Sequence, residues 1–454
     1  MKLVITLFLS TLLSTLNAKV PNLIVIITDD QGWADVGFNG STEIPTPHID
    51  RIANEGARCQ AGYVSFPVCG PSRAGLLTGR YQDRFGFCHN PSIKPEHKAG
   101  IPASEENIAE ILGKVGYHSG IIGKWHMGTH ETMRPLKRGF NEFFGFLSGG
   151  HDYFCEDLNL QDLSEVKEYG DWYRTKILRN NERIDTQGYL TDLLSQEAVS
   201  FVQRNAAKPF FLYLAYNAPH TPMQATEKYL SRFKHIENKK RRTYCAMVSA
   251  VDDGVGLLLD KLDELDLAKD TLIFFLSDNG GATSNASLNK PLRGHKGSTY
   301  EGGIRVPFAV RWTGTIPAKL DYQEAVSSLD ILATMAALTK VPIAPERPLD
   351  GVNLIPHFTG EKEGPPHTEL FWRKARSQEL TILRPPEKLI SKAHDEETEL
   401  YNLNKDRSET QNLAKKNSNL VKTLSKQADS WNSQLQDPAF PGLSAWLKKT
   451  KKKQ

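Results

Sequence analysis

The chain of 454 residues has little of several features that would place it in a special class of proteins. Its 56 basic and 53 acidic side chains leave a net charge of only +3, so the composition gives no overall bias toward nucleic acid. After the first eighteen residues no apolar run is long enough to span a bilayer, and stable membrane insertion is not expected. No motif recurs at a fixed period, which argues against repeat architectures.

The first eighteen residues are the exception, because they have the composition of a secretory signal peptide. Lys2 gives a positive start, residues 3–16 are mostly apolar, and Ala18 is a small residue ahead of an expected cut before Lys19. The apolar run is shorter than a membrane-spanning helix requires, so an N-terminal membrane anchor is the less favoured alternative. No cysteine lies near the cut to carry a lipid. We expect residues 1–18 to be a signal peptide and the protein to be exported, either periplasmic or secreted.

Cysteine is scarce. The chain contains five: Cys59, Cys69, Cys88, Cys155 and Cys245. Export would permit disulfides, and with Cys69 set aside the other four allow three different pairings. The alternative is that they are reduced residues of the core. The sequence leaves both possibilities open.

Four short apolar runs predict buried strands. They are Leu23–Ile27, His118–Ile122, Phe210–Tyr216 and Thr271–Leu276. None of them alternates between apolar and polar residues, as is typical of strands that are covered on both faces. Apolar residues with helical spacing lie around and between them, at 49–53, 108–115 and 194–202. We therefore expect an α/β fold with a mostly parallel central sheet flanked by helices.

The character of the chain changes near residue 360. Residues 361–366 form a charged connection with proline and glycine, and short strand-like segments follow at Glu369–Trp372 and Leu380–Leu383. A polar helix pattern comes next. We expect a large domain over residues 19–360 and a small C-terminal α+β subdomain over residues 361–454. The basic tail, Lys448–Lys453, is interpreted as a solvated chain end.

Each of the four apolar runs leads into a polar cluster at its carboxyl end. The clusters are Thr28-Asp29-Asp30, Gly123-Lys124-Trp125-His126, Asn217-Ala218-Pro219-His220 and Ser277-Asp278-Asn279-Gly280. A single Asp after a strand is usually a helix cap. However, the carboxyl ends of parallel strands meet at one edge of the sheet, and ligands bind there. Four clusters at that edge favour an active site.

The acidic part of this set predicts a metal site. Asp29, Asp30, Asp278 and Asn279 offer only oxygen ligands. Hard oxygen ligands suit calcium or magnesium rather than zinc. Calcium is favoured because several protein oxygens converge, whereas magnesium tends to retain water.

A further motif runs from Cys69 to Arg80, with the sequence Cys-Gly-Pro-Ser-Arg-Ala-Gly-Leu-Leu-Thr-Gly-Arg. A helix is expected to begin around Pro71, because proline suits the first helical turn. Cys69 would then lie at the positive end of the helix, where an anion is stabilised. Arg73 would follow about one turn later.

This motif resembles the signature of the type I sulfatases, which have the alkaline-phosphatase-like fold. The resemblance covers nearly the whole mature chain. It includes Asp29–Gly32, Gly123–Gly128, Ala218–His220, Asp278–Gly280, Gly294–Pro307 around Lys296, Glu399–Leu403 and Glu409–Leu413. The chain differs at Glu387-Lys388-Leu389, where a Trp-Lys-Leu segment is common in relatives.

The resemblance implies that Cys69 is oxidised to Cα-formylglycine by a maturation enzyme, and that one calcium ion is bound. In the implied mechanism, one hydroxyl of hydrated formylglycine attacks sulfur, and the second expels sulfate as the aldehyde forms again. The implied metal ligands are Asp29, Asp30, Asp278, Asn279 and residue 69. The implied roles of the remaining residues are orientation of the nucleophile by Arg73 and His126, and sulfate binding by Lys124, His220 and Lys296. His220 and Lys296 would also protonate the leaving oxygen.

The substrate is expected to be a sulfated carbohydrate rather than a simple aryl sulfate. His151 and Asp152 follow the Ser148-Gly149-Gly150 turn and are interpreted as contacts to sugar hydroxyls, although a pair that only stabilises the loop is an open alternative. Two other functions remain: a phosphate or phosphonate ester hydrolase on the same fold, and a non-catalytic protein that binds sulfated glycans. A host without the maturation machinery would leave the enzyme immature.

Overall fold

The computed structural model describes residues 20–168, 170–392 and 397–443. The expected signal peptide, residues 1–18, and the basic tail, Lys448–Lys453, lie outside this part of the chain. None of the helices in the described ranges is both long and apolar enough to cross a membrane.

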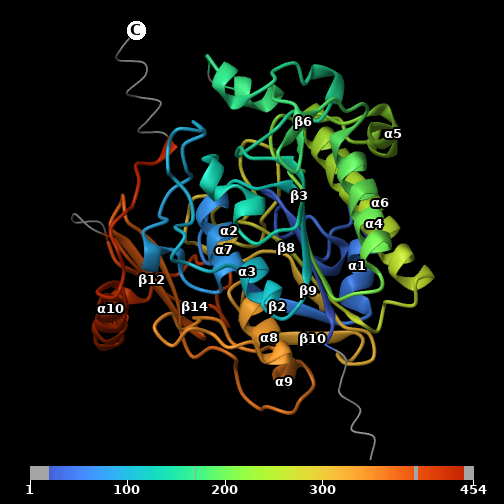
Figure 1. Cartoon of the computed structure of the whole chain (residues 1–454). Helices are drawn as coiled ribbons and strands as arrows, with labels where there is room; N and C mark the ends of the chain where they lie inside the picture. The colour runs from blue at the N-terminus through green and yellow to red at the C-terminus, as the bar shows by residue number, and fades with distance from the viewer. Residues whose placement is uncertain (1–19, 169, 393–396, 444–454) are drawn as a thin grey trace, which may run out of the picture.

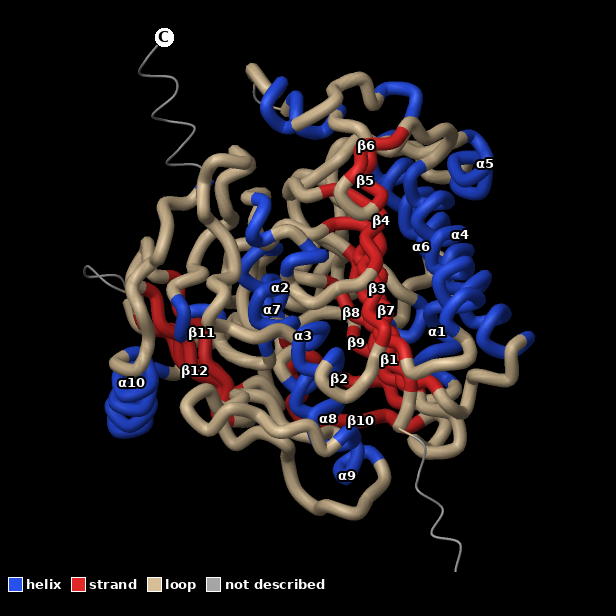
Figure 2. The backbone as a smooth tube through the Cα atoms, viewed as in Figure 1, coloured by secondary structure: helices blue, strands red, loops and turns tan. Residues whose placement is uncertain are grey.

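A ten-stranded sheet runs through the molecule, as Figure 2 shows, in the order β10-β2-β9-β8-β1-β7-β3-β4-β5-β6. Its strands are β1 (Asn22–Thr28), β2 (Ala57–Tyr63), β3 (His118–Lys124), β4 (Glu142–Phe146), β5 (Ile177–Arg179), β6 (Glu182–Ile184), β7 (Phe210–Ala215), β8 (Thr271–Ser277), β9 (Phe308–Arg311) and β10 (Leu320–Ser327). The four predicted strands are β1, β3, β7 and β8. They are adjacent and parallel, with Leu23 opposite both Phe211 and Leu272. The expected α/β fold with a mostly parallel central sheet is confirmed.

The middle of β1 is apolar because both faces of the sheet are covered there. All seven residues of β1 are buried. Leu23, Val25 and Ile27 belong to one hydrophobic core, whereas Ile24 and Ile26 belong to another on the opposite face. Successive side chains of a strand point to opposite faces, so the middle of a strand between two cores favours apolar residues at successive positions.

Helices form a layer on each face of the sheet (Figure 1). The helices of the described residues are α1 (Pro47–Asn54), α2 (Cys69–Thr78), α3 (Ile108–Gly113), α4 (Leu190–Asn205), α5 (Glu227–Leu230), α6 (Lys239–Glu264), α7 (Glu301–Ile304), α8 (Asp330–Thr339), α9 (Ile355–Phe358) and α10 (Ser418–Asn432). α1, α4 and α6 cover one face, and α2, α3 and α8 cover the other. The helices predicted at 49–53, 108–115 and 194–202 correspond to α1, α3 and α4.

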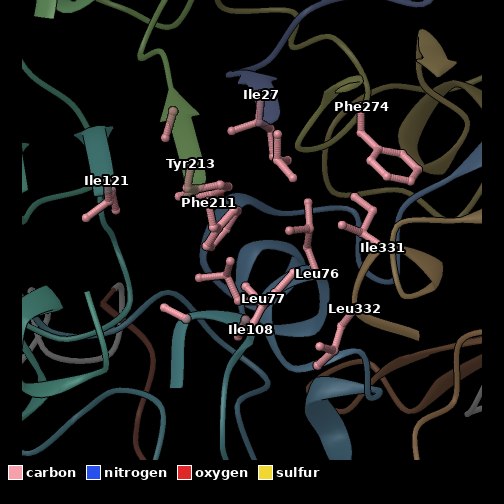
Figure 3. Packing of buried hydrophobic residues seen from close by; sticks show 14 of the residues in the cluster. Ile27, Leu76, Leu77, Ile108, Ile121, Phe211, Tyr213, Phe274, Ile331 and Leu332 are labelled. Carbon is pink, nitrogen blue, oxygen red and sulfur yellow. The ribbon is translucent and has the colours of Figure 1, made fainter. Parts of the chain in front are cut away.

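α2 is held by the core rather than by its own propensity, because all ten of its residues are buried. Figure 3 shows Leu76 and Leu77 of this helix among side chains from β1, β7 and α8, including Ile27, Phe211 and Leu332. The helix begins at Cys69, two residues before the start expected near Pro71. Its amino-terminal end therefore presents Cys69 itself.

The cysteines are all free and buried. Cys59 lies in one core of the large sheet, and Cys155 and Cys245 lie in the other. The structure contradicts the disulfide alternative, and the four cysteines besides Cys69 are reduced, buried residues.

A second, antiparallel sheet follows residue 360. It contains β11 (Leu370–Lys374), β12 (Glu379–Arg384), β13 (Glu387–Ser391) and β14 (Glu399–Asn402), in that order. α10 packs on this sheet through Leu424 and Ala428, which contact Ile382 and Leu389. The small α+β unit at the C-terminal end is present, while a domain boundary at residue 360 stays a prediction.

A buried ionic cluster joins the small sheet to the large domain. Lys388 Nζ, on β13, lies 2.8 Å from a carboxylate oxygen of Glu301 and 2.8 Å from one of Glu409, and all three side chains are fully buried. Arg305 Nη1 contacts the other oxygen of Glu301 at 3.1 Å. Glu301 begins α7, five residues after Lys296. The cluster therefore anchors the loop that carries Lys296.

Replacing Lys388 by Met should strongly destabilise the protein. Met retains most of the side-chain volume but leaves two buried carboxylates without their shared cation, a loss that costs about 3–5 kcal/mol. Chemical unfolding measures the change. The control is Lys415→Met, because the ion pair of Lys415 with Glu397 is solvent-exposed and should contribute less than about 0.5 kcal/mol. Equal losses in the two variants would contradict a structural role for the buried cluster.

Candidate active site

The carboxyl ends of β8, β1, β7 and β3 bring the predicted polar residues to one edge of the large sheet. Asp29 and Asp30 directly follow β1, Lys124 ends β3, and Asp278 directly follows β8. His220 lies in the turn after β7. Because the four strands are neighbours in register, residues distant in sequence meet there.

Cys69 faces this edge from the first turn of α2. Its Sγ lies 3.4 Å from Asp29 Oδ1, 3.9 Å from Asp30 Oδ1 and 3.1 Å from Lys296 Nζ. The thiol is 1% exposed. The predicted nucleophile position is thus enclosed by two carboxylates and one ammonium group.

Each buried carboxylate of the site has a cationic partner. Lys124 Nζ pairs with Asp29 Oδ2. Arg73 Nε donates to Asp278 Oδ2 at 2.9 Å, and Lys296 Nζ lies 2.7 Å from Asp30 Oδ1. Three negative and three positive charges therefore balance within a region that water scarcely reaches.

These neighbours move the pKa values of the acids in opposite directions. Burial alone would raise the pKa of Asp29, but the charges of Lys124, His220 and Arg73 hold it well below its usual range. Burial, together with the nearby charge of Asp29, raises the pKa of Asp278 to about 6, although Arg73 opposes the shift. Asp278 therefore holds a proton more readily than Asp29.

The pKa values of Lys296 and Cys69 also depart from their ordinary ranges. Burial would lower the pKa of Lys296, but Asp30 and the other acidic groups raise it well above its usual range. Burial, with Asp278 and Asp29 adding to it, raises the pKa of the Cys69 thiol. At neutral pH an ammonium group therefore lies beside an uncharged thiol.

A group of potential metal ligands with oxygen, sulfur and nitrogen donors converges at this edge. One ligand atom from each of Asp29, Asp30, Cys69 and His220 lies within 4.8 Å of the others. Asn279 is fully buried and donates through Nδ2 to Asp30 Oδ1 at 2.8 Å, while its Oδ1 has no hydrogen-bond partner. A buried amide oxygen without a donor is costly unless something accepts its lone pairs. An oxygen-binding cation would do so, and its identity as calcium stays a prediction.

The structure places His220 within this four-residue group and Asp278 outside it. The resemblance in sequence assigned Asp278 to the metal and His220 to the sulfate. Asp278 Oδ1 accepts from the backbone N–H of Asp30 at 3.2 Å, so it lies beside the group of four rather than within it. His220 was predicted only as a contact to substrate, yet its imidazole approaches the same oxygens. Its Nε2 lies 3.6 Å from Asp30 Oδ2.

His126 is held in a strained backbone conformation next to the site. Its φ of 58° lies in the left-handed region, which a non-glycine residue adopts only at a cost. The Nδ1 atom is buried without a partner. Burial, with Lys124 and Arg73 adding to it, lowers the pKa of His126 well below its usual range. The ring packs on Gly149, where a Cβ would lie 2.7 Å from Nε2. Gly149, in the Ser148-Gly149-Gly150 turn, is therefore favoured by its close packing against the His126 ring.

Access to the site from solvent is limited to one side. The side chains of Asp29, Asp278, Arg73 and Lys124 are fully buried. Those of Lys296 and His220 retain 21% and 14% exposure. A substrate that approaches Cys69 would therefore meet Lys296 and His220 first.

His151 does not have the position that was expected for a contact to sugar. It is fully buried, with Nε2 2.7 Å from the carbonyl oxygen of Thr175 and Nδ1 3.0 Å from that of Asp152. Burial lowers the pKa of His151 to about 4, although both carbonyl contacts raise it and a neutral ring can donate to only one of the two oxygens. The interpretation as a substrate contact is corrected: the ring stabilises the loop. Asp152 is only partly buried, and its contact to substrate stays a prediction.

Two asparagines that the sequence reasoning did not single out support the site. Asn90 Oδ1 accepts the backbone N–H of Gly70 at 2.9 Å, so it satisfies a free donor at the start of α2. Asn285 Nδ2 donates to the carbonyl oxygens of Asp30, at 3.1 Å, and Pro219, at 3.0 Å. It ties the loops after β1 and β7 together. Both lie in polar loops where nothing local distinguishes them.

Comparison with known proteins gives two family matches. The family model described as Sulfatase matches residues 21–341, and the model described as N-sulphoglucosamine sulphohydrolase, C-terminal, matches residues 295–434. The chain is similar to N-acetylgalactosamine-6-sulfatase of Mus musculus, with 36% identity over 351 residues. That alignment covers 74% of this chain and 66% of the relative, which is just under two thirds of the relative's length.

Solved structures extend the similarity to nearly the whole chain. The crystal structure of Ps i-CgsB has a TM-score of 0.88 and 39% identity, and the match covers 93% of this chain and 94% of that one. The same protein in complex with k-i-k-neocarrahexaose has a TM-score of 0.87, 39% identity and the same coverage.

Removing calcium should lower the thermal stability and abolish activity. The buried Oδ1 atom of Asn279 is left without a partner when the cation is removed, and a ligand that binds only the folded state stabilises it by about 2.7 kcal/mol at 100 times its Kd. Scanning fluorimetry after chelation, with calcium or magnesium added back, measures the shift in Tm.

The control for this experiment is a pair of Asp→Asn variants. Asp278→Asn should lose the calcium-dependent shift, whatever its own Tm, whereas Asp321→Asn, at an exposed position of β10, should retain it. Full activity and an unchanged Tm after exhaustive chelation, with no metal found by elemental analysis, would rule out the metal site.

Proposed function

The chain belongs to the sulfatase family, and we propose that it hydrolyses sulfate esters of a sulfated carbohydrate by means of a nucleophile made from Cys69. The observation that carries the proposal is the position of Cys69. Its Sγ lies at the start of a buried helix, 3.4 Å from Asp29 and 3.1 Å from Lys296, at the edge where four parallel strands end. An attacking group at this position would meet both a cation site and a proton donor.

The nucleophile itself requires the oxidation of Cys69 to formylglycine. A neutral thiol is a poor nucleophile toward sulfate esters and a poor ligand for a hard cation. The hydrated aldehyde supplies two geminal hydroxyls, one to attack sulfur and one to expel the sulfate. A maturation enzyme that acts on this cysteine is therefore a required partner.

A calcium ion held by Asp29, Asp30, Asp278, Asn279 and residue 69 would supply positive charge to the nucleophile and to one sulfate oxygen. The protein's own charges cancel, so a dication at this place would leave the site net positive. That excess would suit a sulfate ester, which carries one negative charge, and the sulfate dianion that is released.

The surrounding cations orient the reacting groups. Arg73 is fixed by its bond to Asp278, and His126 by its packing on Gly149, so both would hold the hydroxyls of residue 69 in place. Lys124 and Lys296, which neutralise Asp29 and Asp30, would also contact sulfate oxygens. Rigid donors of this kind need no rearrangement when charge develops.

Lys296 and His220 are the candidates for protonating the leaving oxygen, because they line the exposed side of the site. The raised pKa of Lys296 keeps its proton available at neutral pH. His220 Nδ1 lies 2.6 Å from the carbonyl oxygen of Thr221. A carbonyl oxygen can only accept a hydrogen bond, so Nδ1 carries a hydrogen. The other ring nitrogen, Nε2, faces Asp30 in the site. A second proton on Nε2 would be the one that is transferred, and burial opposes it by lowering the pKa of His220, while Asp29 and Asp30 favour it.

The proposed substrate class is supported by the relatives. One is named N-acetylgalactosamine-6-sulfatase, and another was solved with k-i-k-neocarrahexaose bound. Asp152, on the loop beside His126, remains a candidate contact to sugar hydroxyls. The composition of residues 1–18 supports export, to the periplasm or beyond the cell.

The alternative of a phosphate or phosphonate ester hydrolase is less well supported. Such enzymes with two metals need more His and Asp ligands than this edge offers, and only one four-residue donor group is found in the described part of the chain. Rates on 4-nitrophenyl sulfate, phosphate and phenylphosphonate separate the candidates. A non-catalytic glycan-binding protein is disfavoured because Cys69 and the metal carboxylates are all present.

Mass spectrometry of the peptide that contains Cys69 tests the proposal directly. Active protein should show conversion to formylglycine, which a hydrazide captures, and activity should scale with the converted fraction across expression hosts. Cys69→Ala should fold but be inactive. The matched control is Cys245→Ala, a buried cysteine of α6 on the other face of the sheet, which should remain active. Normal turnover by unconverted protein or by Cys69→Ala would overturn the mechanism.

His220→Ala should slow the hydrolysis of sulfated sugars far more than that of 4-nitrophenyl sulfate. A sugar alkoxide needs a proton as it leaves and a nitrophenolate barely does, and general acid catalysis contributes roughly 10²–10⁴-fold. Steady-state kcat on both substrates measures the difference. His235→Ala, at an exposed position, should change neither. Equal losses on both substrates would assign His220 to sulfate binding alone.

A further inference from the structure

The turn that carries His220, residues 217–221, accepts hydrogen bonds at successive carbonyl oxygens. Its own backbone closes it, because the N–H of His220 donates to the carbonyl oxygen of Asn217 at 2.8 Å. The loop after β1 and the side chain of Asn285 bond the two oxygens between them, those of residues 218 and 219. The imidazole takes its direction from the same turn, since Nδ1 lies 2.6 Å from the carbonyl oxygen of Thr221. The position of Nε2 therefore depends on the position of the turn.

Tyr153 bonds this turn from a different loop, the one that follows β4. Its hydroxyl oxygen lies 2.7 Å from the carbonyl oxygen of Asn217 and 2.8 Å from that of His220. A carbonyl oxygen can only accept, so the single hydroxyl hydrogen is shared between the two oxygens as a three-centre bond. Burial raises the pKa of Tyr153 well above its usual range, with Tyr189 and Asp29 adding to it, so the hydroxyl keeps this hydrogen. One phenol thus holds the first residue of the turn and His220 itself.

The ring of Tyr153 is held independently of its hydroxyl. It is fully buried and stacks on Tyr189, with the ring centroids 5.9 Å apart. Its backbone N–H donates to Gln224 Oε1 at 2.8 Å, and its carbonyl oxygen accepts from the backbone N–H of Leu190, the first residue of α4, at 2.8 Å. The phenol therefore reaches the turn from a fixed base. Phenylalanine in its place would keep the packing and lose only the hydrogen bond.

We propose that Tyr153 is a positioning residue that fixes His220 for protonation of the leaving oxygen. A proton donor must lie within hydrogen-bond reach of the atom that it protonates, and a displacement of about 1 Å can cost about 10²-fold in rate. Tyr153 acts through the two carbonyl oxygens of the turn and not on the substrate itself. The inference rests on the proposed function, in which His220 is a candidate proton donor.

The bond also joins two parts of the proposed site. Tyr153 directly follows Asp152, the candidate contact to sugar hydroxyls. Asn217 Nδ2 donates to the carbonyl oxygen of His151 at 3.3 Å, so the same loop is bonded to the turn a second time. The loop proposed to contact the sugar and the turn that carries the proton donor are therefore held together.

A comparison of leaving groups with Tyr153→Phe tests the inference in the matured full chain. 4-Methoxyphenyl sulfate releases a more basic phenolate than 4-nitrophenyl sulfate, so its hydrolysis depends more on a proton donor. Tyr153→Phe should lower kcat about tenfold on the methoxy ester and less than about twofold on the nitro ester. The matched control is Tyr117→Phe, which removes another buried hydrogen bond from a phenol to a backbone carbonyl, that of Pro21 at 2.6 Å. It should change neither rate.

A double-mutant cycle separates positioning of His220 from a merely structural role. In the His220→Ala background, Tyr153→Phe should cost less than about twofold on either ester, because the group that it positions is gone. An equal loss with and without His220, or an equal loss on the two esters in the single variant, would overturn the inference.

NMR of protein labelled at its histidine rings separates failure of the inference from failure of the proposed function. The signals of His220, identified by their loss in His220→Ala, should shift in Tyr153→Phe and stay unchanged in Tyr117→Phe. Unchanged His220 signals in Tyr153→Phe would overturn the inference whatever the activity. Matured protein that hydrolyses neither ester, while these signals still shift, would instead overturn the function on which the inference rests.

Discussion

Charge neutralisation at the carboxyl edge of the large sheet is the constraint on which the rest of the structure depends. Asp29 and Asp278 are fully buried and Asp30 is 2% exposed. Taking a carboxylate out of water costs several kcal/mol unless a cation and hydrogen bonds compensate. The compensating groups come from different elements, Lys124 from β3 and Arg73 from α2. A shift of any one element would therefore leave an unpaired buried charge.

The same constraint explains why the motif that begins at Cys69 contains small residues. α2 must lie deep enough for Arg73 to reach Asp278, and the helix then has no room on its inner side. A Cβ at Gly75 would lie 2.2 Å from Ser65 Oγ, and one at Gly70 would lie 2.9 Å from Asn90 Oδ1. The glycines are thus needed for close packing of the helix, in addition to any part they have in recognition by a maturation enzyme.

The sequence predicted the central strands and the residues at their ends, because a strand buried on both faces leaves an uninterrupted apolar run. The outer strands were missed, since β2 and β10 are partly exposed and show no such run. Asn285 and Lys388 were missed because their roles depend on contacts with residues far away along the chain. His151 was misplaced for the same reason: its neighbours suggested a binding loop, but packing against Thr175 decides where the ring lies.

The structure divides chemistry and selectivity between two parts of the chain. The carboxylates and Cys69 are buried, and of the side chains around them Lys296 and His220 are partly exposed. The buried groups can therefore contact little of a substrate beyond the sulfate and its ester oxygen. Under the proposed function, discrimination among sulfated sugars comes from the groups around that opening. Lys388 of the small sheet pairs with Glu301, which follows the loop that carries Lys296. Because a single buried cluster holds both, the small sheet and the loop that carries Lys296 are fixed relative to each other.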